Sequence, residues 1–561
     1  MSRRPLLVAG LLVLLAAVVL AGGFAAGAVR LGPSPPTTAL GSPHFVEETA
    51  SAGLVQTYDG DETYDVGGGL AVLDCDADGR PDVYAAGGEH PAAVYRNTSR
   101  IGGSVTFERV RAATTDLTGV TGAYPLDVDA DGMTDLAVLR VGQSQLLRGL
   151  GSCRFERADE AWHATPTRGF GSAFSATWEG DAARPTLAFG TYLELDASGE
   201  PGTTCGTNEL LPPDSSGVTY GDPIALAPGY CALSMLFSDW DGSGRRDLRV
   251  SNDRHYYDAE HGEEQLWRIE RDAPPRLYTA EDGWALLQLW GMGIASYDVT
   301  GDGYPEVYLT SQGPNTLQTL LAGPAQPTYR DLANKHGIEG TRPATGGDPL
   351  PSTAWHPEFQ DVNNDGFMDL FVSKGNVNVL PDYATRDPSD LYLGQPDGSW
   401  VQAVAEAGIA HFDRGRGAAL ADLNLDGLLD LVEVNVSAPV RVWRNVGTGT
   451  SEAPAPMGHW LAWRLRQPGG NRDAIGAVVE TRVGERVLGR REVVVGGGHL
   501  SGQLGWTTVG LGPATEAELR VTWPDGEVGP WQRAAADGFV ILERGSTEVH
   551  TSTPAGTEDG G

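Results

Sequence analysis

Six nine-residue segments carry the side chains in this sequence that are best suited to bind a cation. Each has an oxygen-bearing side chain at positions one, three, five and nine, and glycine at position six. Carboxylate, amide and hydroxyl oxygens bind hard cations, and glycine allows the positive φ that a tight loop around an ion needs. The predicted ligands are Asp74, Asp76, Asp78 and Asp82; Asp127, Asp129, Asp131 and Asp135; Asp239, Asp241, Ser243 and Asp247; Asp298, Thr300, Asp302 and Glu306; Asp361, Asn363, Asp365 and Asp369; and Asp422, Asn424, Asp426 and Asp430.

Ligand chemistry favours calcium in these loops. Oxygen-only ligands, with one more expected from the backbone carbonyl at position seven, suit Ca²⁺ better than Zn²⁺ or Cu²⁺, and Mg²⁺ prefers to keep several waters. We expect up to six structural Ca²⁺ ions. The loops from Asp74 and Asp127 carry four carboxylates each and rank first, whereas the loop from Asp239 ranks last because Ser243 occupies position five. The alternative is a set of acidic turns without metal.

The spacing of the loops points to the elements that hold them. They recur about every 60 residues, with one double gap near residue 180. There Gly169–Ala173 resembles Gly291–Ala295, but residues 176–186 have no pair of carboxylates eight residues apart, so we expect a unit that kept its fold and lost its ion. Each unit reads as a glycine-rich strand, the loop and three further short strands. Four strands repeated seven times predict an all-β, seven-bladed β-propeller over residues 43–447.

The two ends of this region predict how the ring closes. The last unit stops after Asn445 without an outer strand, and Phe45–Glu48 has the pattern of that strand ahead of the first unit. We therefore expect the N-terminal strand to complete the last blade and to cover its edge.

A different composition follows the propeller. Residues 448–457 read as a linker, residues 458–545 as a small β-sandwich-like domain, and residues 546–561 as a disordered tail. Four segments of this domain look like the signature of the ASPIC/UnbV domain: Asn471–Ala477, Gly496–Ser501, Val509–Gly512 and Val521–Gly526. The acidic loops resemble FG-GAP/VCBS repeats, which also occur in integrin α-chain propellers. Together, over residues 43–545, the chain resembles the cartilage acidic protein family. That resemblance implies an extracellular, calcium-binding propeller.

The N-terminus carries an export signal. Arg3 and Arg4 precede an uncharged, apolar stretch over residues 5–29. Its length fits an uncleaved signal anchor within residues 1–30, and the small residues Ala26–Ala28 fit a cleaved signal peptide. Residues 31–42 then form a Pro-rich linker. We expect an extracytoplasmic protein, anchored at the cell surface by the helix or secreted if the signal is cleaved.

The net charge and the four cysteines indicate which classes of partner the protein can bind and whether it forms disulfides. The net charge of −34 argues against nucleic acid, because no basic stripe is present to neutralise phosphates. Twenty of the 24 predicted ligands are carboxylates, so much of the acidity belongs to the loops. We expect a disulfide between Cys205 and Cys231. Cys75 and Cys153 are either a second bridge or two buried thiols.

No established catalytic motif stands out. His499, Ser501 and Asp473 would allow a triad, but a glycine-rich turn is the simpler interpretation. Trp355 and His356 are expected in a long connection on one propeller face. Our first hypothesis is a non-enzymatic, calcium-binding module for cell adhesion, with a monomeric ectodomain and an extracellular protein or glycan as partner. The alternative is an enzyme, a lyase or hydrolase, acting on extracellular polysaccharide.

Overall fold

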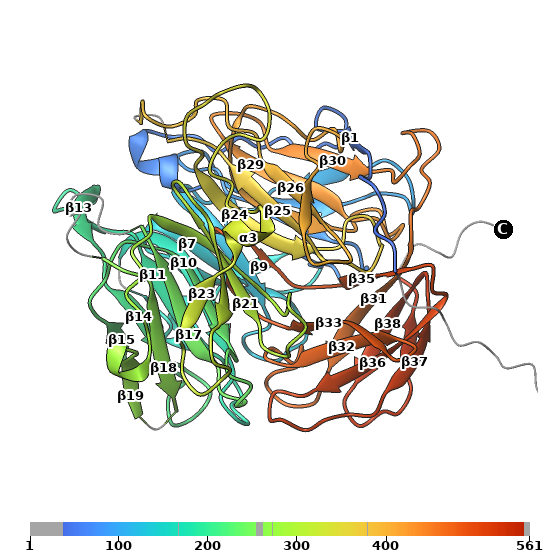
Figure 1. The fold of residues 1–561 in the computed structure, drawn as a ribbon. Coiled ribbons are helices and arrows are strands. Elements are labelled where there is room, and N and C mark those ends of the chain that lie inside the picture. Colours follow the sequence, from blue (N-terminus) through green and yellow to red (C-terminus); the bar gives the residue numbers. More distant parts are fainter. Residues whose placement is uncertain (1–36, 167, 254–261, 272, 378–379, 555–561) are drawn as a thin grey trace, which may run out of the picture.

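In the computed structural model, strands follow one another in antiparallel groups of four (Figure 1). The structure describes residues 37–166, 168–253, 262–271, 273–377 and 380–554. The predicted anchor or signal peptide at residues 1–30 lies outside them. Within the described residues, no helix has the length and apolar character needed to cross a bilayer.

The groups are as follows. The first is β2 (Leu70–Leu73), β3 (Asp82–Ala85), β4 (Ala93–Asn97) and β5 (Phe107–Val110). The second is β6 (Val120–Leu126), β7 (Asp135–Gly142), β8 (Gln145–Gly149) and β9 (Phe155–Arg157). The third is β10 (Gly169–Thr177), β11 (Thr186–Thr191), β14 (Asn208–Leu211) and β15 (Ile224–Leu226). The fourth is β16 (Ala232–Ser238), β17 (Asp247–Asn252), β18 (Gln265–Glu270) and β19 (Ala273–Leu277).

Three more groups complete the series. They are β20 (Gly291–Tyr297), β21 (Glu306–Ser311), β22 (Thr316–Leu320) and β23 (Tyr329–Asp331); β24 (Ala354–Gln360), β25 (Asp369–Lys374), β26 (Asp390–Gly394) and β27 (Trp400–Gln402); and β28 (Arg414–Ala421), β29 (Asp430–Val436), β30 (Arg441–Asn445) and β1 (Phe45–Glu47). A hairpin of β12 (Leu193–Leu195) and β13 (Pro201–Cys205) projects from the third group. The short helices are η1 (Glu62–Val66), α2 (Asp159–Trp162), η2 (Ala280–Asp282) and α3 (Ala333–His336).

The first strands of these groups form a closed circuit. Each of β2, β6, β10, β16, β20 and β24 contacts the next first strand, and β28 contacts β2. β1 pairs antiparallel with β30, with Phe45 opposite Asn445, which confirms that the N-terminal strand completes the last group. The all-β prediction is confirmed. The count of seven blades stays a prediction, and this circuit agrees with it.

The innermost strands are buried along their length, which explains their small and apolar residues. Every residue of β6, β10 and β16 is buried. In the third group, Ala176 of β10 pairs with Leu187 of β11, and the turn between these strands has no pair of carboxylates at the first and ninth positions of an acidic loop. The strands expected for this unit are therefore present, and the loss of its ion stays a prediction.

The C-terminal part forms two four-stranded sheets that share a hydrophobic core. One sheet consists of β35 (Thr507–Gly512), β31 (His459–Arg466), β38 (Gly538–Glu543) and β39 (His550–Ser552), and the other of β33 (Arg486–Glu492), β32 (Val478–Val483), β36 (Glu516–Thr522) and β37 (Gln532–Ala535). The disordered tail predicted from residue 546 is wrong for β39, because this strand pairs with β38. Its residues were too few and too polar for a strand pattern to stand out.

Both cysteine pairs form disulfides. Cys205 is bonded to Cys231, as predicted, and Cys75 is bonded to Cys153. The second bridge links the first acidic loop to the turn between β8 and β9. Of the two alternatives for Cys75 and Cys153, the structure shows the bridge.

Candidate functional site

All six acidic loops share one backbone frame. In each, the amide of the sixth-position glycine donates to Oδ2 of the first-position aspartate, over 2.8 to 3.1 Å. The six glycines have φ between 81° and 96°, so the predicted reason for glycine at this position is confirmed. This hydrogen bond turns the chain back on itself and brings the oxygens at positions one, three and five to one side.

The fourth position of each loop is also left-handed, which sequence reasoning missed. Its φ lies between 57° and 72°, although Ala77, Ala130 and Leu425 are not residues that favour this region. Gly242, Gly301 and Asn364 at the same position were the signal that could have revealed it. Each loop therefore contains two residues with left-handed backbone conformation, at positions four and six. Alanine and leucine adopt this conformation at position four although it is unfavourable for them.

The ninth-position carboxylate has a second role that the sequence did not reveal. Oδ2 of Asp430 accepts from the amide of Leu423 at 3.0 Å, and Oδ1 accepts from the amide of Asn445 at 2.8 Å. The same two bonds, to the second loop residue and to the third strand of the group, recur at Asp82, Asp135 and Asp369. This residue therefore fastens the loop to β4, β8, β26 or β30, besides any part in binding an ion.

Two loops depart from this pattern. Glu306 accepts from the amides of Val299 and Thr300 and from the hydroxyl of Thr319, but reaches no third-strand amide. Asp247 receives the indole N–H of Trp240 at 2.9 Å in place of the second-position amide. A contact with the Thr319 hydroxyl thus takes the place of the third-strand amide at Glu306, and the Trp240 indole takes the place of the second-position amide at Asp247.

In two of the six loops, the gathered carboxylate oxygens fit a cation of the size of Ca²⁺. Single carboxylate oxygens of Asp74, Asp76 and Asp78 lie within 4.8 Å of one another. Those of Asp127, Asp129 and Asp135 do the same. Because Ca²⁺ binds oxygen at about 2.4 Å, one ion can contact each oxygen of such a set.

Several oxygens in the loops are buried without a partner. Oδ1 of Asp74, of Asp127 and of Asp298 accepts no hydrogen bond within the described residues, and neither does Oδ1 of Asn424. A buried, unsatisfied oxygen costs free energy, which a bound cation would offset. The residues present therefore fit a divalent ion, at positions one, three and five of the loop from Asp74 and at positions one, three and nine of the loop from Asp127.

Burial also changes the protonation of these carboxyls. It raises the pKa of Asp127 to about 7 and the pKa values of Asp135 and Asp361 to about 8, because a charge away from water is disfavoured. The loops therefore gather carboxyls that need either a proton or a cation near neutral pH.

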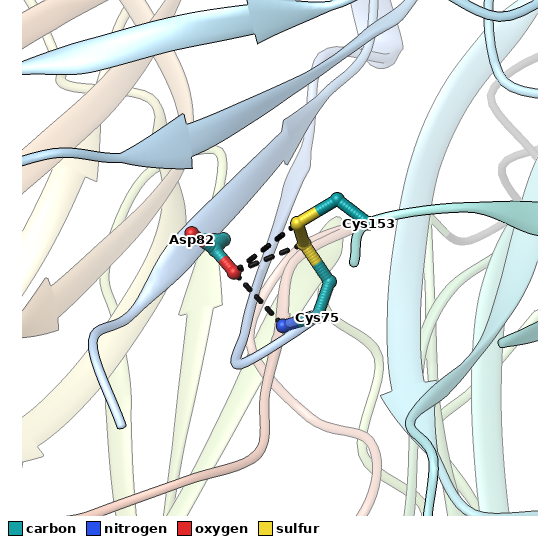
Figure 2. A group of neighbouring side chains, drawn as sticks. All are labelled: Cys75, Asp82 and Cys153. Atoms are coloured by element: carbon teal, nitrogen blue, oxygen red, sulfur yellow. Dashed lines mark hydrogen bonds between the residues drawn. A yellow bond between two sulfur atoms is a disulfide. The ribbon is translucent and has the colours of Figure 1, made fainter. Parts of the chain in front are cut away.

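A third cluster of possible ligands, Cys75, Asp82 and Cys153, is not a metal site (Figure 2). The two sulfurs are bonded to each other, so neither is a thiolate available to a metal. Asp82 Oδ2 accepts from the Cys75 amide at 2.8 Å. The disulfide thus reinforces the clamp at the first loop.

A segment of the C-terminal domain runs through the middle of the ring. We call residues 495–503 the axial segment. Val495 bridges to Ala176 of β10, and Gly496 to Leu236 of β16. Gly498 bridges to Ile294 of β20, and within the segment β34 (Gly502–Gln503) pairs parallel with β2. The central strands thus gain backbone partners from a distant part of the chain.

The remaining first strands are reached by His499 and Ser501. The His499 amide donates to Nδ1 of His356 in β24 at 3.0 Å. Ser501 bridges to Ala123 of β6, and its Oγ lies against Gly417 of β28. The axial segment therefore contacts the first strand of every group.

Glycine makes this close approach possible. A Cβ on Gly69 would lie 1.9 Å from the Leu500 carbonyl oxygen, and a Cβ on Gly498 would lie 2.5 Å from the His356 ring. Gly496, Gly497 and Gly498 all have positive φ. Glycine is therefore frequent in and beside the first strands because the backbone of the axial segment packs closely against them, and not only because a blade needs a turn.

His499 and Ser501, two of the residues considered for catalysis, are instead packed between the axial segment and the first strands. His499 is fully buried, its Nε2 lies 3.1 Å from the Val66 carbonyl, and Ser501 Oγ accepts from the Leu70 amide. Trp355 and His356 lie in β24 and are buried, so their predicted place in a long connection on one propeller face is wrong. Both belong to a bulged inner strand, which sequence spacing did not reveal.

A buried cation lies beside His499. The Arg416 guanidinium is 4.1 Å from the Trp355 ring centroid and donates to the carbonyls of Asp65 and Gly375. Burial, with Arg416 nearby, lowers the pKa of His499 to about 3. His499 is therefore neutral in the folded chain.

This shift predicts acid sensitivity of the axial segment. An unfolded histidine has a pKa of about 6.5, so the stability linked to neutral His499 is present above that pH and is lost as pH falls toward 3. Between pH 7 and pH 5 the unfolding free energy should fall by about 2 kcal/mol on this account. Denaturant unfolding in saturating Ca²⁺ checks it. H499Q should lose this pH dependence, and H90Q, at an exposed position, should keep it. An unchanged slope in H499Q would contradict the assignment.

Sequence comparison identifies the repeats and the C-terminal domain. The FG-GAP-like repeat matches residues 74–138 and 361–433, and the ASPIC and UnbV family matches residues 467–549. Cartilage acidic protein 1 of Homo sapiens is 25% identical over 235 residues, which span 39% of this chain and 32% of that protein. The Xenopus tropicalis protein is 24% identical over 521 residues, which span 87% of this chain and 74% of that protein. The human match thus spans about a third of its relative.

Solved structures are more distant. The extracellular domain of a putative hybrid two component system from B. thetaiotaomicron is 10% identical with a TM-score of 0.37, over 90% of this chain and 59% of that one. PorZ, a surface component of the type-IX secretion system of Porphyromonas gingivalis, is 14% identical with a TM-score of 0.37, over 84% and 60%. The family matches alone show that the chain contains FG-GAP-like repeats and an ASPIC and UnbV domain, and this combination suggests an extracellular, adhesion-type module.

Proposed function

We propose that this chain, with its FG-GAP-like repeats and its ASPIC and UnbV domain, is an exported, calcium-stabilised propeller that binds a protein or glycan without catalysis. The supporting observation is the set of loop oxygens that are gathered, buried and unpartnered in the described residues. The side chains at positions one, three, five and nine, with the carbonyl at position seven, would hold each Ca²⁺. The ion would supply the positive charge that fixes the loop.

The C-terminal domain already covers the loop side of the ring. The Asp239 amide donates to Glu492, the Gly512 amide donates to the Asn364 carbonyl, and Trp460 packs on Gly427. In Figure 1 the hairpin of β12 and β13 projects away from this domain. The opposite end of the ring, with its longer connections, is therefore the surface that we assign to the partner. Calcium then acts on binding through the rigidity of the ring.

A binding screen tests this function. The full-length chain in non-ionic detergent should capture an extracellular protein or a glycan in Ca²⁺ and should return the ligand chemically unchanged. Capture should weaken at least tenfold in chelator, because loosened loops no longer hold the connections between blades in place. Cleavage of a polysaccharide in the same screen would support the enzyme alternative and overturn the proposal.

A further inference from the structure

In four of the six acidic loops, an arginine from another part of the chain or from the loop itself forms an ion pair with a loop carboxylate. From the C-terminal domain, Arg464 Nη1 lies 3.3 Å from Asp74 Oδ2, and Arg490 Nη1 lies 3.1 Å from Asp298 Oδ2. Arg472 lies more loosely, with its Nε 3.8 Å from Asp127 Oδ2. Each contact falls on the first-position aspartate, one of the predicted ligands.

Arginines of the propeller add to this set. Arg148 is 2.7 Å from both Asp129 and Asp131, in the loop from Asp127. Arg245 is 2.9 Å from Asp247 and 3.4 Å from Asp241, in the loop from Asp239. A guanidinium is always protonated and leaves an oxygen only when its own hydrogen bonds are replaced.

The loops from Asp361 and Asp422 differ. Among the described residues, no Lys or Arg nitrogen lies within the 4.0 Å that defines an ion pair with their carboxylates. Asp361, Asp369, Asp422 and Asp430 are at most 4% exposed. These two loops thus collect buried carboxylates with which no described Lys or Arg forms an ion pair, although the more distant charge of Arg444 favours the ionised form of Asp426.

An independent observation at the loop from Asp422 points to a ligand. Asn424, at position three, is 1% exposed, and its Oδ1 has no partner within the described residues. Its Nδ2 donates to Asp426 Oδ2 at 3.0 Å, which places the amide against the loop carboxylates. The two loops also touch, because Asn364 Nδ2 donates to the Gly427 carbonyl at 2.8 Å.

From this division we propose that the loops from Asp361 and Asp422 are the two tight cation sites, and that arginines act as built-in counter-ions that weaken the other four. The inference rests on the proposed function, since it assumes that the cation is Ca²⁺. This order differs from the one predicted from carboxylate number, which ranked the loops from Asp74 and Asp127 first, because burial and pairing outweigh the count of ligands. Calcium entering the Asp74 or Asp298 loop must displace an arginine of the C-terminal domain.

Calorimetric Ca²⁺ titration of the full-length, chelator-treated chain in detergent tests this division. The wild type should show two tight sites and a weaker class. R490Q should tighten one weak site about tenfold, the effect of removing one competing charge pair of roughly 1.4 kcal/mol. R482Q is the matched control, since Arg482 pairs with Glu518 at 2.9 Å and lies in no loop contact. It should leave the isotherm unchanged.

Two loop variants complete the test. D422N should remove one tight site, and D426N, at a less buried position of the same loop, serves if D422N does not fold. The division is overturned if all sites bind Ca²⁺ with equal affinity and R490Q leaves that affinity unchanged. It is also overturned if D422N and D426N both keep two tight sites. Either result would leave the proposed function standing. No Ca²⁺ binding at all would overturn both.

Discussion

A chain that ends after Met457 should lose the cooperative unfolding of the ring. Such a chain lacks the axial segment, which contacts the first strand of every group and supplies β2 with its parallel partner. Removing the segment leaves the backbone of these strands without its partners and exposes the buried Arg416. A loss of about 5 kcal/mol is enough to unfold a domain of ordinary stability.

Thermal unfolding and limited proteolysis measure this effect. A chain that ends after Gly545 is the control, because it keeps the axial segment and loses only β39 and the residues around it. It should unfold cooperatively, within a few degrees of the full chain. If the chain ending after Met457 melts at the same midpoint as the full chain, the axial segment is not part of the folded core and this account of it is wrong.

Removing Ca²⁺ from the full chain should lower its unfolding midpoint by about 5 °C. A site at a hundredfold excess of Ca²⁺ over its Kd adds about 2.7 kcal/mol of unfolding free energy, so two tight sites add about 5 kcal/mol. For a chain of 561 residues, each kcal/mol corresponds to about 1 °C. The physical cause is the buried carboxylates of the loops from Asp361 and Asp422, which repel one another without a cation.

Scanning calorimetry in Ca²⁺ and in chelator measures this shift. D422N should show about half of the wild-type shift, because only one tight site remains. D397N alters an exposed turn aspartate that accepts from Ser399 and should keep the full shift. A midpoint that is the same with and without chelator would mean that the loops are acidic turns that need no metal.

Local features of this fold could be predicted from the sequence. The loops can be recognised in the sequence by glycine at position six and an acidic residue at positions one and nine, because each of these residues makes its contacts within or next to its own loop. The pairing of β1 with β30 was also predictable, since Phe45–Glu48 supplies the strand pattern that the last group lacks. The bridge between Cys205 and Cys231 closes a short segment around one insertion.

The axial segment could not be predicted. Gly496–His499 has no strand periodicity, and its partners lie far away in the sequence, as in the bond from the Leu70 amide to Ser501 across 431 residues. The same distance hides the pairing of Arg490 with Asp298. Sequence ranking of the loops counted carboxylates, whereas burial and counter-charges depend on which part of the chain covers each loop.

The metal content of the folded chain tests the central claim most directly. The chain purified in Ca²⁺ and passed through a desalting column should be analysed by elemental mass spectrometry. We expect about two Ca²⁺ per chain to remain bound in the wild type and about one in D422N. Folded protein that carries no calcium, or that carries the same amount in D422N, would contradict the claim that these loops hold structural ions.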